Sequence, residues 1–172
     1  MIWTVLGQQG GTFQCFTPSG FVSMPTSQRG APTYCSGRTP GYWKQQQFFS
    51  SWLPPYYPIT SGGNSASLFS AYFQPLPGTC PVGTDWSTVT FLQVLSPELY
   101  TRTTNSGAPF DIARLLIASL LNVAQGWVSV LTAPLVQDIW TEYMTKGYFE
   151  PTAGVKWYHD DIVSYLGSTQ PV

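Results

Sequence analysis

One stretch of the sequence decides the fold, and it is residues 109–125, Pro109-Phe-Asp-Ile-Ala-Arg-Leu-Leu-Ile-Ala-Ser-Leu-Leu-Asn-Val-Ala-Gln125. Its few polar residues fall on one narrow stripe of a helix: Asp111, Arg114, Asn122 and Gln125. The rest of the surface of this helix is apolar, and Gly126 ends it. A helix that is apolar on almost every side has to be covered by other elements. We therefore predict that this helix lies at the centre of the core.

Three more segments of the second half have helical patterns. Residues 132–146 repeat apolar side chains at helical spacing, with Thr132 as the cap and Gly147 after the last turn. Residues 158–166 predict a short final helix that ends before Gly167. Residues 86–95 favour a helix, although Val89 and Phe91 leave a strand as the alternative. The Ser-Pro-Glu sequence that follows predicts the start of another helix.

The first half has short strand-like runs separated by turns. The runs are residues 2–6, 13–16 and 21–24, and residues 29–40 have the glycines and prolines of a loop. Residues 48–53 and 68–73 are long enough only for short helices. We predict an α+β fold in a single domain of residues 1–172, with a loop-rich half, 1–84, and a compact helical half, 85–172.

Charge is divided unevenly along the chain. Residues 1–84 contain no aspartate or glutamate and only three cations, Arg29, Arg38 and Lys44, whereas all eight carboxylates lie between Asp85 and Asp161. The first half therefore has no carboxylate for a general base or for a hard metal ion, and it has no histidine. This excludes most enzyme chemistries from that half.

The composition favours a protein that makes contacts with others. Charged residues make up 9% of the chain and aromatic residues 16%, against roughly 25% charged residues in an average soluble domain. Such a chain covers its surface with neutral polar side chains or buries it against neighbours. Subunits of shells and fibres and secreted surface proteins often have this composition.

The cysteines leave the redox compartment open. Cys15, Cys35 and Cys80 allow one disulfide and a spare thiol, or three buried thiols. If a bridge forms, Cys15–Cys35 is the expected pair because it closes a short loop. A Cys/His metal site is not expected, since the cysteines form no CxxC pair and the chain has one histidine.

His159-Asp160-Asp161 is the one cluster that resembles an active site. Neighbouring residues of a helix point about 100° apart, so these three side chains do not easily converge. We interpret the cluster as a helix start with an exposed histidine, where acids complement the helix dipole. We therefore predict no enzyme activity, no catalytic residue and no cofactor.

Nucleic acid is not expected as a partner, and a membrane-spanning segment is not expected either. Three scattered cations cannot form a nucleic-acid footprint. The apolar run of residues 112–124 is shorter than the roughly 20 residues that a membrane span needs. No signal peptide is recognisable at the start of the sequence.

Aromatic loop residues are the main candidates for contact. Between residues 42 and 57 the chain has seven rings, namely Tyr42, Trp43, Phe48, Phe49, Trp52, Tyr56 and Tyr57. They could anchor other subunits, stack on sugar rings, or simply cover the core beneath long loops. The candidate contact residues are Tyr42, Trp43, Trp52, Tyr56, Tyr57, Arg38 and Lys44, together with Ile2, Trp3 and Val5 of an N-terminal strand that could be exchanged between copies.

Residues 35–44 read Cys35-Ser-Gly-Arg-Thr-Pro-Gly-Tyr-Trp-Lys44. This segment resembles the C-x-R-[ST]-P-G-[YF]-W-K segment of small uncharacterised bacterial and prophage-encoded surface proteins. Residues 139–166 also resemble the closing helices of that group. An Asn-His-Pro usually follows the lysine there, whereas this chain has Gln45-Gln46-Gln47. The resemblance implies a secreted or virion-associated location, and no catalytic residue.

From these observations we expect a non-enzymatic structural protein, a self-assembling subunit or decoration protein of a virion or extracellular filament. Its partners would be copies of itself, with the basic first half of one meeting the acidic second half of the next, or other subunits of a larger assembly. The alternative is a glycan- or receptor-binding module that uses the same aromatic loops. The expected location is a virion, the extracellular space or the cell surface.

Overall fold

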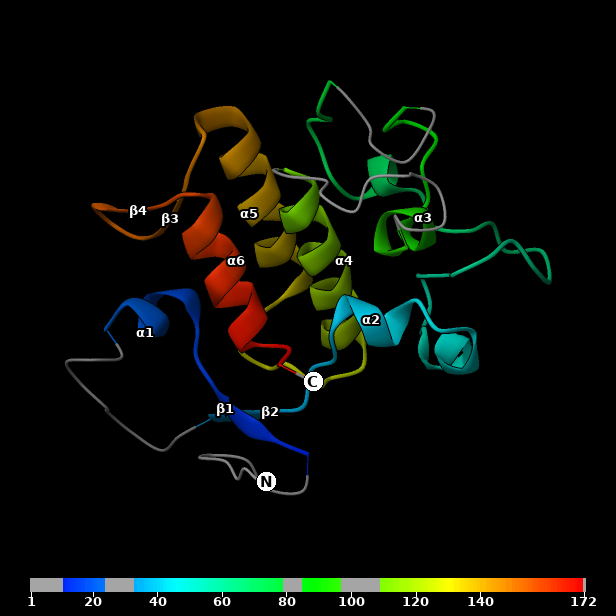
Figure 1. Ribbon diagram of the computed structural model, residues 1–172, viewed down its shortest axis with the longest axis horizontal. Helices are drawn as coiled ribbons and strands as arrows, with labels where there is room; N and C mark the ends of the chain where they lie inside the picture. The colour runs from blue at the N-terminus through cyan, green and yellow to red at the C-terminus, as the bar shows by residue number, and fades with distance from the viewer. Residues whose placement is uncertain (1–10, 24–32, 79–84, 97–108, 172) are drawn as a thin grey trace.

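The computed structural model describes residues 11–23, 33–78, 85–96 and 109–171, and it confirms the predicted α+β fold. Three long helices form the centre of the structure, and short strands and single-turn helices surround them (Figure 1). No helix in these ranges is long and apolar enough to cross a bilayer. The predicted strand of residues 2–6 and the predicted helix start at residue 97 lie outside the described residues.

Helix α4 (Phe110–Ala124) is the central element, as predicted. It packs against α5 (Ala133–Lys146) and α6 (His159–Ser168), and most of its side chains are buried. One residue of its predicted polar stripe differs from the expectation, because Asn122 is fully buried. Its polar partners are described with the candidate site.

The ends of α5 and α6 follow from their sequences. Thr132 caps α5 by accepting a hydrogen bond from the Leu135 amide at 3.2 Å, and Gly147 ends it in the left-handed conformation at φ 87°. In α6, the Asp161 carboxylate accepts a hydrogen bond from the Tyr158 amide at 3.0 Å. This helix continues through Gly167 to Ser168, two residues further than the predicted end at residue 166.

A small hairpin between α5 and α6 was not predicted. It pairs β3 (Phe149–Thr152) with β4 (Val155–Trp157), and Gly154 occupies its turn at φ 83°. Phe149 and Trp157 lie opposite each other in the hairpin and both are buried. Strands this short carry too few residues to show an alternating pattern in the sequence.

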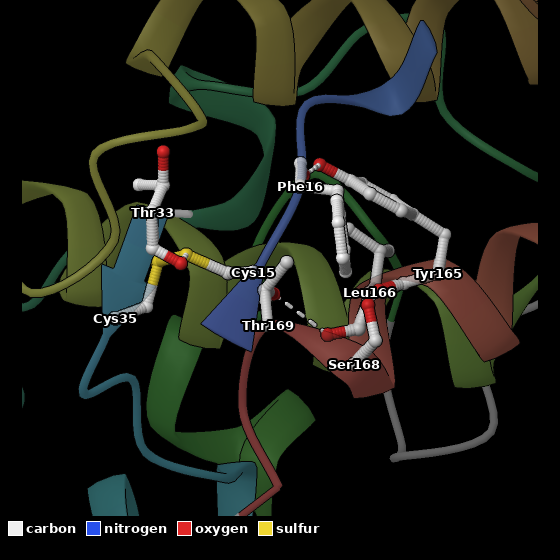
Figure 2. The surroundings of a disulfide bond; sticks show 8 residues. All are labelled: Cys15, Phe16, Thr33, Cys35, Tyr165, Leu166, Ser168 and Thr169. Atoms are coloured by element: carbon white, nitrogen blue, oxygen red, sulfur yellow. Dashed lines mark hydrogen bonds between the residues drawn. A yellow bond between two sulfur atoms is a disulfide. The ribbon is translucent and has the colours of Figure 1, made fainter. Parts of the chain in front are cut away.

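The N-terminal strands form a second hairpin. Strand β1 (Phe13–Cys15) pairs antiparallel with β2 (Thr33–Cys35). The predicted strand of residues 13–16 is therefore confirmed, and the predicted loop of residues 29–40 contains a strand. A disulfide joins Cys15 to Cys35, which is the predicted pair (Figure 2). Cys80 lies outside the described residues.

The predicted strand of residues 21–24 is wrong. Residues Pro18–Ser23 form helix α1, whose Phe21 ring makes edge contacts with Trp157 and Tyr165. These contacts seat α1 on the hairpin β3–β4 and on helix α6. Tertiary packing of one ring therefore outweighs the strand propensity of the sequence.

The loop-rich half contains two short 3₁₀ helices, η1 (Gln46–Ser51) and η2 (Phe69–Ala71), which overlap the short helices expected at residues 48–53 and 68–73. It also contains helix α2 (Pro40–Trp43), which was not predicted. The predicted helix of residues 86–95 is shorter in the structure, because α3 spans only Phe91–Leu95. Thr90 and Gln93 form a capping box that starts α3 at this point. Trp86 and Val89 still reach the core from the preceding turn.

The buried Tyr165 hydroxyl connects α6 to the N-terminal hairpin and makes stability depend on pH. It donates a hydrogen bond to the Phe16 carbonyl at 2.7 Å (Figure 2). Burial raises the pKa of Tyr165 far above its ordinary value of 10.0. Above that ordinary value the unfolded chain loses the proton that the folded chain keeps, so stability falls as pH rises.

We predict that Tyr165→Phe lowers the free energy of unfolding by about 1 kcal/mol at neutral pH, because one hydrogen bond is lost. Between pH 9 and pH 11 the free energy of unfolding should fall less in this variant than in the wild type. The reason is that phenylalanine has no hydroxyl proton to lose in the unfolded chain. Urea unfolding at these pH values measures both effects. Tyr34→Phe, at an exposed ring, is the control at neutral pH. Parallel alkaline losses in the wild type and Tyr165→Phe would contradict the prediction.

Candidate functional site

The segment from Cys35 to Lys44 is fixed to the end of helix α4 by hydrogen bonds to its main chain. The Ser36 amide donates to the Trp127 carbonyl at 2.8 Å. The Arg38 amide donates to Asn122 Oδ1 at 2.9 Å, and Asn122 Nδ2 donates to the Arg38 carbonyl at 2.9 Å. One buried amide side chain therefore fixes both main-chain polar groups of Arg38.

The same Asn122 oxygen also holds a tryptophan. Trp43 Nε1 donates to Asn122 Oδ1 at 3.2 Å, and the Trp43 ring is fully buried. The Trp43 carbonyl in turn accepts a hydrogen bond from Trp52 Nε1 at 3.2 Å. These bonds fix α2 and the end of η1 against the bundle.

The main chain at Gly37 lies so close to Thr169 and Val128 that a glycine is required there. A β-carbon at this position would lie 2.3 Å from the Thr169 carbonyl oxygen and 2.7 Å from Val128 Cγ2. Only a residue without a side chain fits there. The contact brings the segment together with the C-terminal end of α6.

Helix α2 was not predicted, but its first residues have the capping pattern of a helix start. The Thr39 hydroxyl accepts a hydrogen bond from the Tyr42 amide at 3.4 Å, and Pro40 occupies the first helical position. The short helix leaves Tyr42 half-buried and the Arg38 side chain exposed at the surface. In Figure 1, α2 and the turn that follows lie at the lower right, at the end of α4.

Three side chains form a stack on this surface. The Tyr42 ring lies parallel to the Phe48 ring, with centroids 4.0 Å apart and planes 19° apart. The Arg38 guanidinium carbon lies 5.0 Å from the centre of the Tyr42 ring. The Tyr42 hydroxyl lies 3.2 Å from the Ser51 hydroxyl, which helps to fix the ring.

An open groove runs along this stack, and we call it the Arg38 groove. Its volume is about 650 Å³, and its lining consists of Arg38, Thr39, Gly41, Tyr42, Gln45 and Phe48. The Gln45 amide is held by Gly41, whose carbonyl accepts from Gln45 Nε2 at 2.9 Å. The lining thus combines ring surface, a hydroxyl, an amide and one cation. Among the described residues of this lining there is no carboxylate or histidine.

The structure corrects three of the candidate contact residues. Trp43, Trp52 and Tyr56 are buried in the core, so they are not exposed contact residues of the folded chain. Their rings pack under the loops, because a ring buries more apolar surface there than in solvent. This is the third of the alternatives that the aromatic pattern left open.

The remaining candidates have different surroundings. Tyr42 and Arg38 line the Arg38 groove. Tyr57 is half-buried, and its amide donates a hydrogen bond to the Ser67 hydroxyl at 2.9 Å. Lys44 forms the C-cap of α2. Ile2, Trp3 and Val5 lie outside the described residues. Thr39 and Gln45 could not be identified from the sequence, since isolated polar residues near a turn are common.

His159 is less isolated than the sequence suggested. Its Nδ1 lies 2.8 Å from Asp160 Oδ1, and its Nε2 lies 3.4 Å from Asp111 Oδ2 at the start of α4. The expected exposed histidine is therefore only partly exposed, and its second carboxylate comes from another helix. Asp161 instead caps α6. These contacts orient a surface histidine between two carboxylates, and no serine, threonine or cysteine is bonded to it among the residues that the structure describes.

Within the described ranges, no three histidine, cysteine or acidic side chains gather closely enough to hold a metal ion. Comparison with protein-family models, with curated proteins and with solved structures gave no match to this chain. A proposal about function therefore rests on the geometry of the Arg38 groove and on the positions of the charged residues.

We predict that Gly37→Ala destabilises the fold by about 1–3 kcal/mol, because the added methyl group collides with the main chain at Thr169. Gly167→Ala is the matched control. A β-carbon there has no neighbour within 4 Å, and the residue lies inside α6, where alanine should be neutral or stabilising by up to about 1 kcal/mol. Thermal unfolding of both variants measures the difference. Equal stability of the two would show that Gly37 is not under steric constraint.

Proposed function

We propose that the chain is a non-enzymatic binding module of an extracellular or virion surface, and that the Arg38 groove holds a saccharide. The observation that carries the proposal is the combination of stacked rings with fixed hydrogen-bonding groups in one preformed groove. Binding sites are typically concave, apolar in part and provided with a few well-placed polar groups.

The chemistry of the lining suits a sugar ring. One face of a pyranose carries C–H groups that pack on an aromatic ring, and its hydroxyls need donors and acceptors at the rim. Phe48 and Tyr42 supply ring surface, while Thr39 and Gln45 supply polar groups. Because Gln45 and Tyr42 are already held by hydrogen bonds, little conformational entropy is lost on binding.

Two features support a location outside the cytoplasm. The disulfide between Cys15 and Cys35 is typical of proteins that fold in an oxidising compartment. The low content of charged residues is typical of proteins that work in contact with other surfaces. The non-enzymatic assignment rests on the lining of the groove, which offers neither a general base nor a nucleophile paired with one.

We predict that the wild-type protein binds defined members of a glycan array and that Phe48→Ala weakens this binding three- to tenfold, since one ring surface is lost. Phe49→Ala is the matched control, because Phe49 is the neighbouring half-buried ring but does not line the groove. Circular dichroism of both variants checks that they fold. A protein that binds no glycan of the array would overturn the proposed function.

A second candidate function, subunit assembly, is favoured by the positions of the charges. Asp111 lies in the first turn of α4, beside His159, and Asp160 and Asp161 lie in the first turn of α6. Arg38 lies at the other end of α4, where Asn122 holds its main chain. Asp111 and Asn122 are separated by about 17 Å along the helix. An acidic end and a basic end therefore face opposite ways along one axis, as head-to-tail contact between copies requires.

The assembly candidate predicts that the particle size depends on salt. Copies should associate at low ionic strength and dissociate at about 0.5 M salt, because contacts between exposed charges are screened. Replacement of Arg29, Arg38 and Lys44 by glutamine should abolish association at low salt. Light scattering after size-exclusion chromatography measures this. A monomer at every salt concentration would contradict assembly and leave the saccharide-binding function as it stands.

A further inference from the structure

We infer that the ligand of the Arg38 groove is an acidic saccharide, whose carboxylate or sulfate group binds the Arg38 guanidinium. This inference rests on the proposed saccharide-binding function and adds the charge of the ligand to it. It follows from a difference within Arg38: the main chain is hydrogen-bonded to Asn122, whereas the guanidinium lies at the groove.

The fold uses only the main chain of Arg38. Its amide and carbonyl are both bonded to Asn122, at 2.9 Å each. The guanidinium, by contrast, has no acceptor among the described residues and makes one contact, with the Tyr42 ring. Its five N–H donors are therefore all available to a ligand.

Among the residues that the structure describes, no carboxylate balances this charge. The surrounding segment belongs to residues 1–84, which contain no aspartate or glutamate. In the described part of the chain no acidic side chain lies within ion-pair distance of Arg38; the ion pairs there join Lys146 to Glu142 and Glu150, and His159 to Asp111 and Asp160. An uncompensated cation at the edge of a groove favours an anion.

The Tyr42 ring restricts the position of the guanidinium. A guanidinium over an aromatic face keeps the in-plane N–H groups free, and these form the fork that binds a carboxylate or sulfate through two parallel hydrogen bonds. Tyr42 is itself fixed by Phe48 and by the Ser51 hydroxyl. The cation is therefore positioned before the ligand arrives, which reduces the entropy lost on binding.

The other groups of the lining select the rest of the ligand. A single arginine beside rings, a hydroxyl and an amide matches one negative charge on a polyhydroxylated ring. A nucleic acid would need several cations along its phosphates, whereas the groove lining supplies one. An acidic saccharide can pair its anionic group with the arginine, pack its C–H face on Phe48 and bond its hydroxyls to the polar rim.

The test compares matched ligands on one array. The pairs are oligogalacturonate with its methyl ester, dextran sulfate with dextran, and sialylated with desialylated oligosaccharides. The carboxylate pairs and the sulfate pair distinguish the two sources of the anion. We predict at least tenfold tighter binding of the acidic member of one or more pairs, because a charge-assisted bidentate contact is added.

Three variants identify the residue responsible. Arg38→Gln should remove the preference for the acidic ligand, and Arg38→Lys should retain part of it, since lysine keeps the charge without the fork. Neither replacement touches the main-chain bonds to Asn122, so both variants should fold like the wild type. Lys156→Gln is the matched control, because Lys156 is also an exposed cation over a ring, 4.6 Å from the centre of Tyr148, but lies on β4.

The outcomes distinguish the acidic character of the ligand from the saccharide-binding function itself. An acidic preference that Arg38→Gln removes and Lys156→Gln leaves intact supports the inference. Equal binding of neutral and acidic partners, or an acidic preference that survives in Arg38→Gln, overturns the inference and leaves the saccharide function in place. Binding of none of the glycans overturns both. A salt-dependent interaction with DNA of arbitrary sequence, in place of glycans, would likewise overturn both.

Discussion

The buried amide of Asn122 is the interaction on which the rest of the structure depends. It lies in the most apolar helix of the chain and is fully excluded from solvent. An amide in such a place destabilises the fold unless its oxygen and nitrogen find partners. The Arg38 main chain and the Trp43 indole are those partners. Helix α4 can therefore be buried without a polar penalty only when the segment from Cys35 to Lys44 is in place.

This arrangement connects the core to the surface groove. The disulfide and Gly37 bring the segment to the end of α4, and Asn122 fixes it there. The short helix α2 then holds Tyr42 against Phe48, with Arg38 over the ring. Because the groove is supported from below by core residues, its side chains are held in position without a ligand. The residue that carries the exposed charge is thus held by the core through its main chain alone.

The elements that could be predicted from the sequence are those with strong local signals. The periodicity and the caps of α4 and α5 span many residues, and the pair Cys15–Cys35 closes a short loop. The hairpin β3–β4 was missed because its strands are too short for a pattern, and α1 was mistaken for a strand because its helix is fixed by ring contacts from distant residues. Local sequence contains no information about such partners.

The candidate site shows the same limit. Arg38 and Tyr42 were expected at a contact surface, and the structure places both in the groove. Trp43, Trp52 and Tyr56 come from the same aromatic run, yet they are buried. The rings between residues 42 and 57 follow no helical or strand periodicity that would separate buried from exposed ones. The segment passes through the short helices α2 and η1 and the turns beside them. Asn122 was grouped with the polar stripe of α4 because the sequence could not show that a distant loop would cover the end of this helix.

The central claim, that a buried asparagine holds the main chain of Arg38 while its side chain stays free, can be tested by hydrogen exchange in ¹⁵N-labelled protein. The account predicts that the Arg38 amide and the Trp43 indole N–H exchange only through large-scale unfolding, with protection close to that of the amides inside α4. The Arg38 side-chain Nε–H should exchange at the rate of a solvent-exposed guanidinium. Fast exchange of the Arg38 amide and the Trp43 indole, at rates like those of exposed loops, would contradict the account.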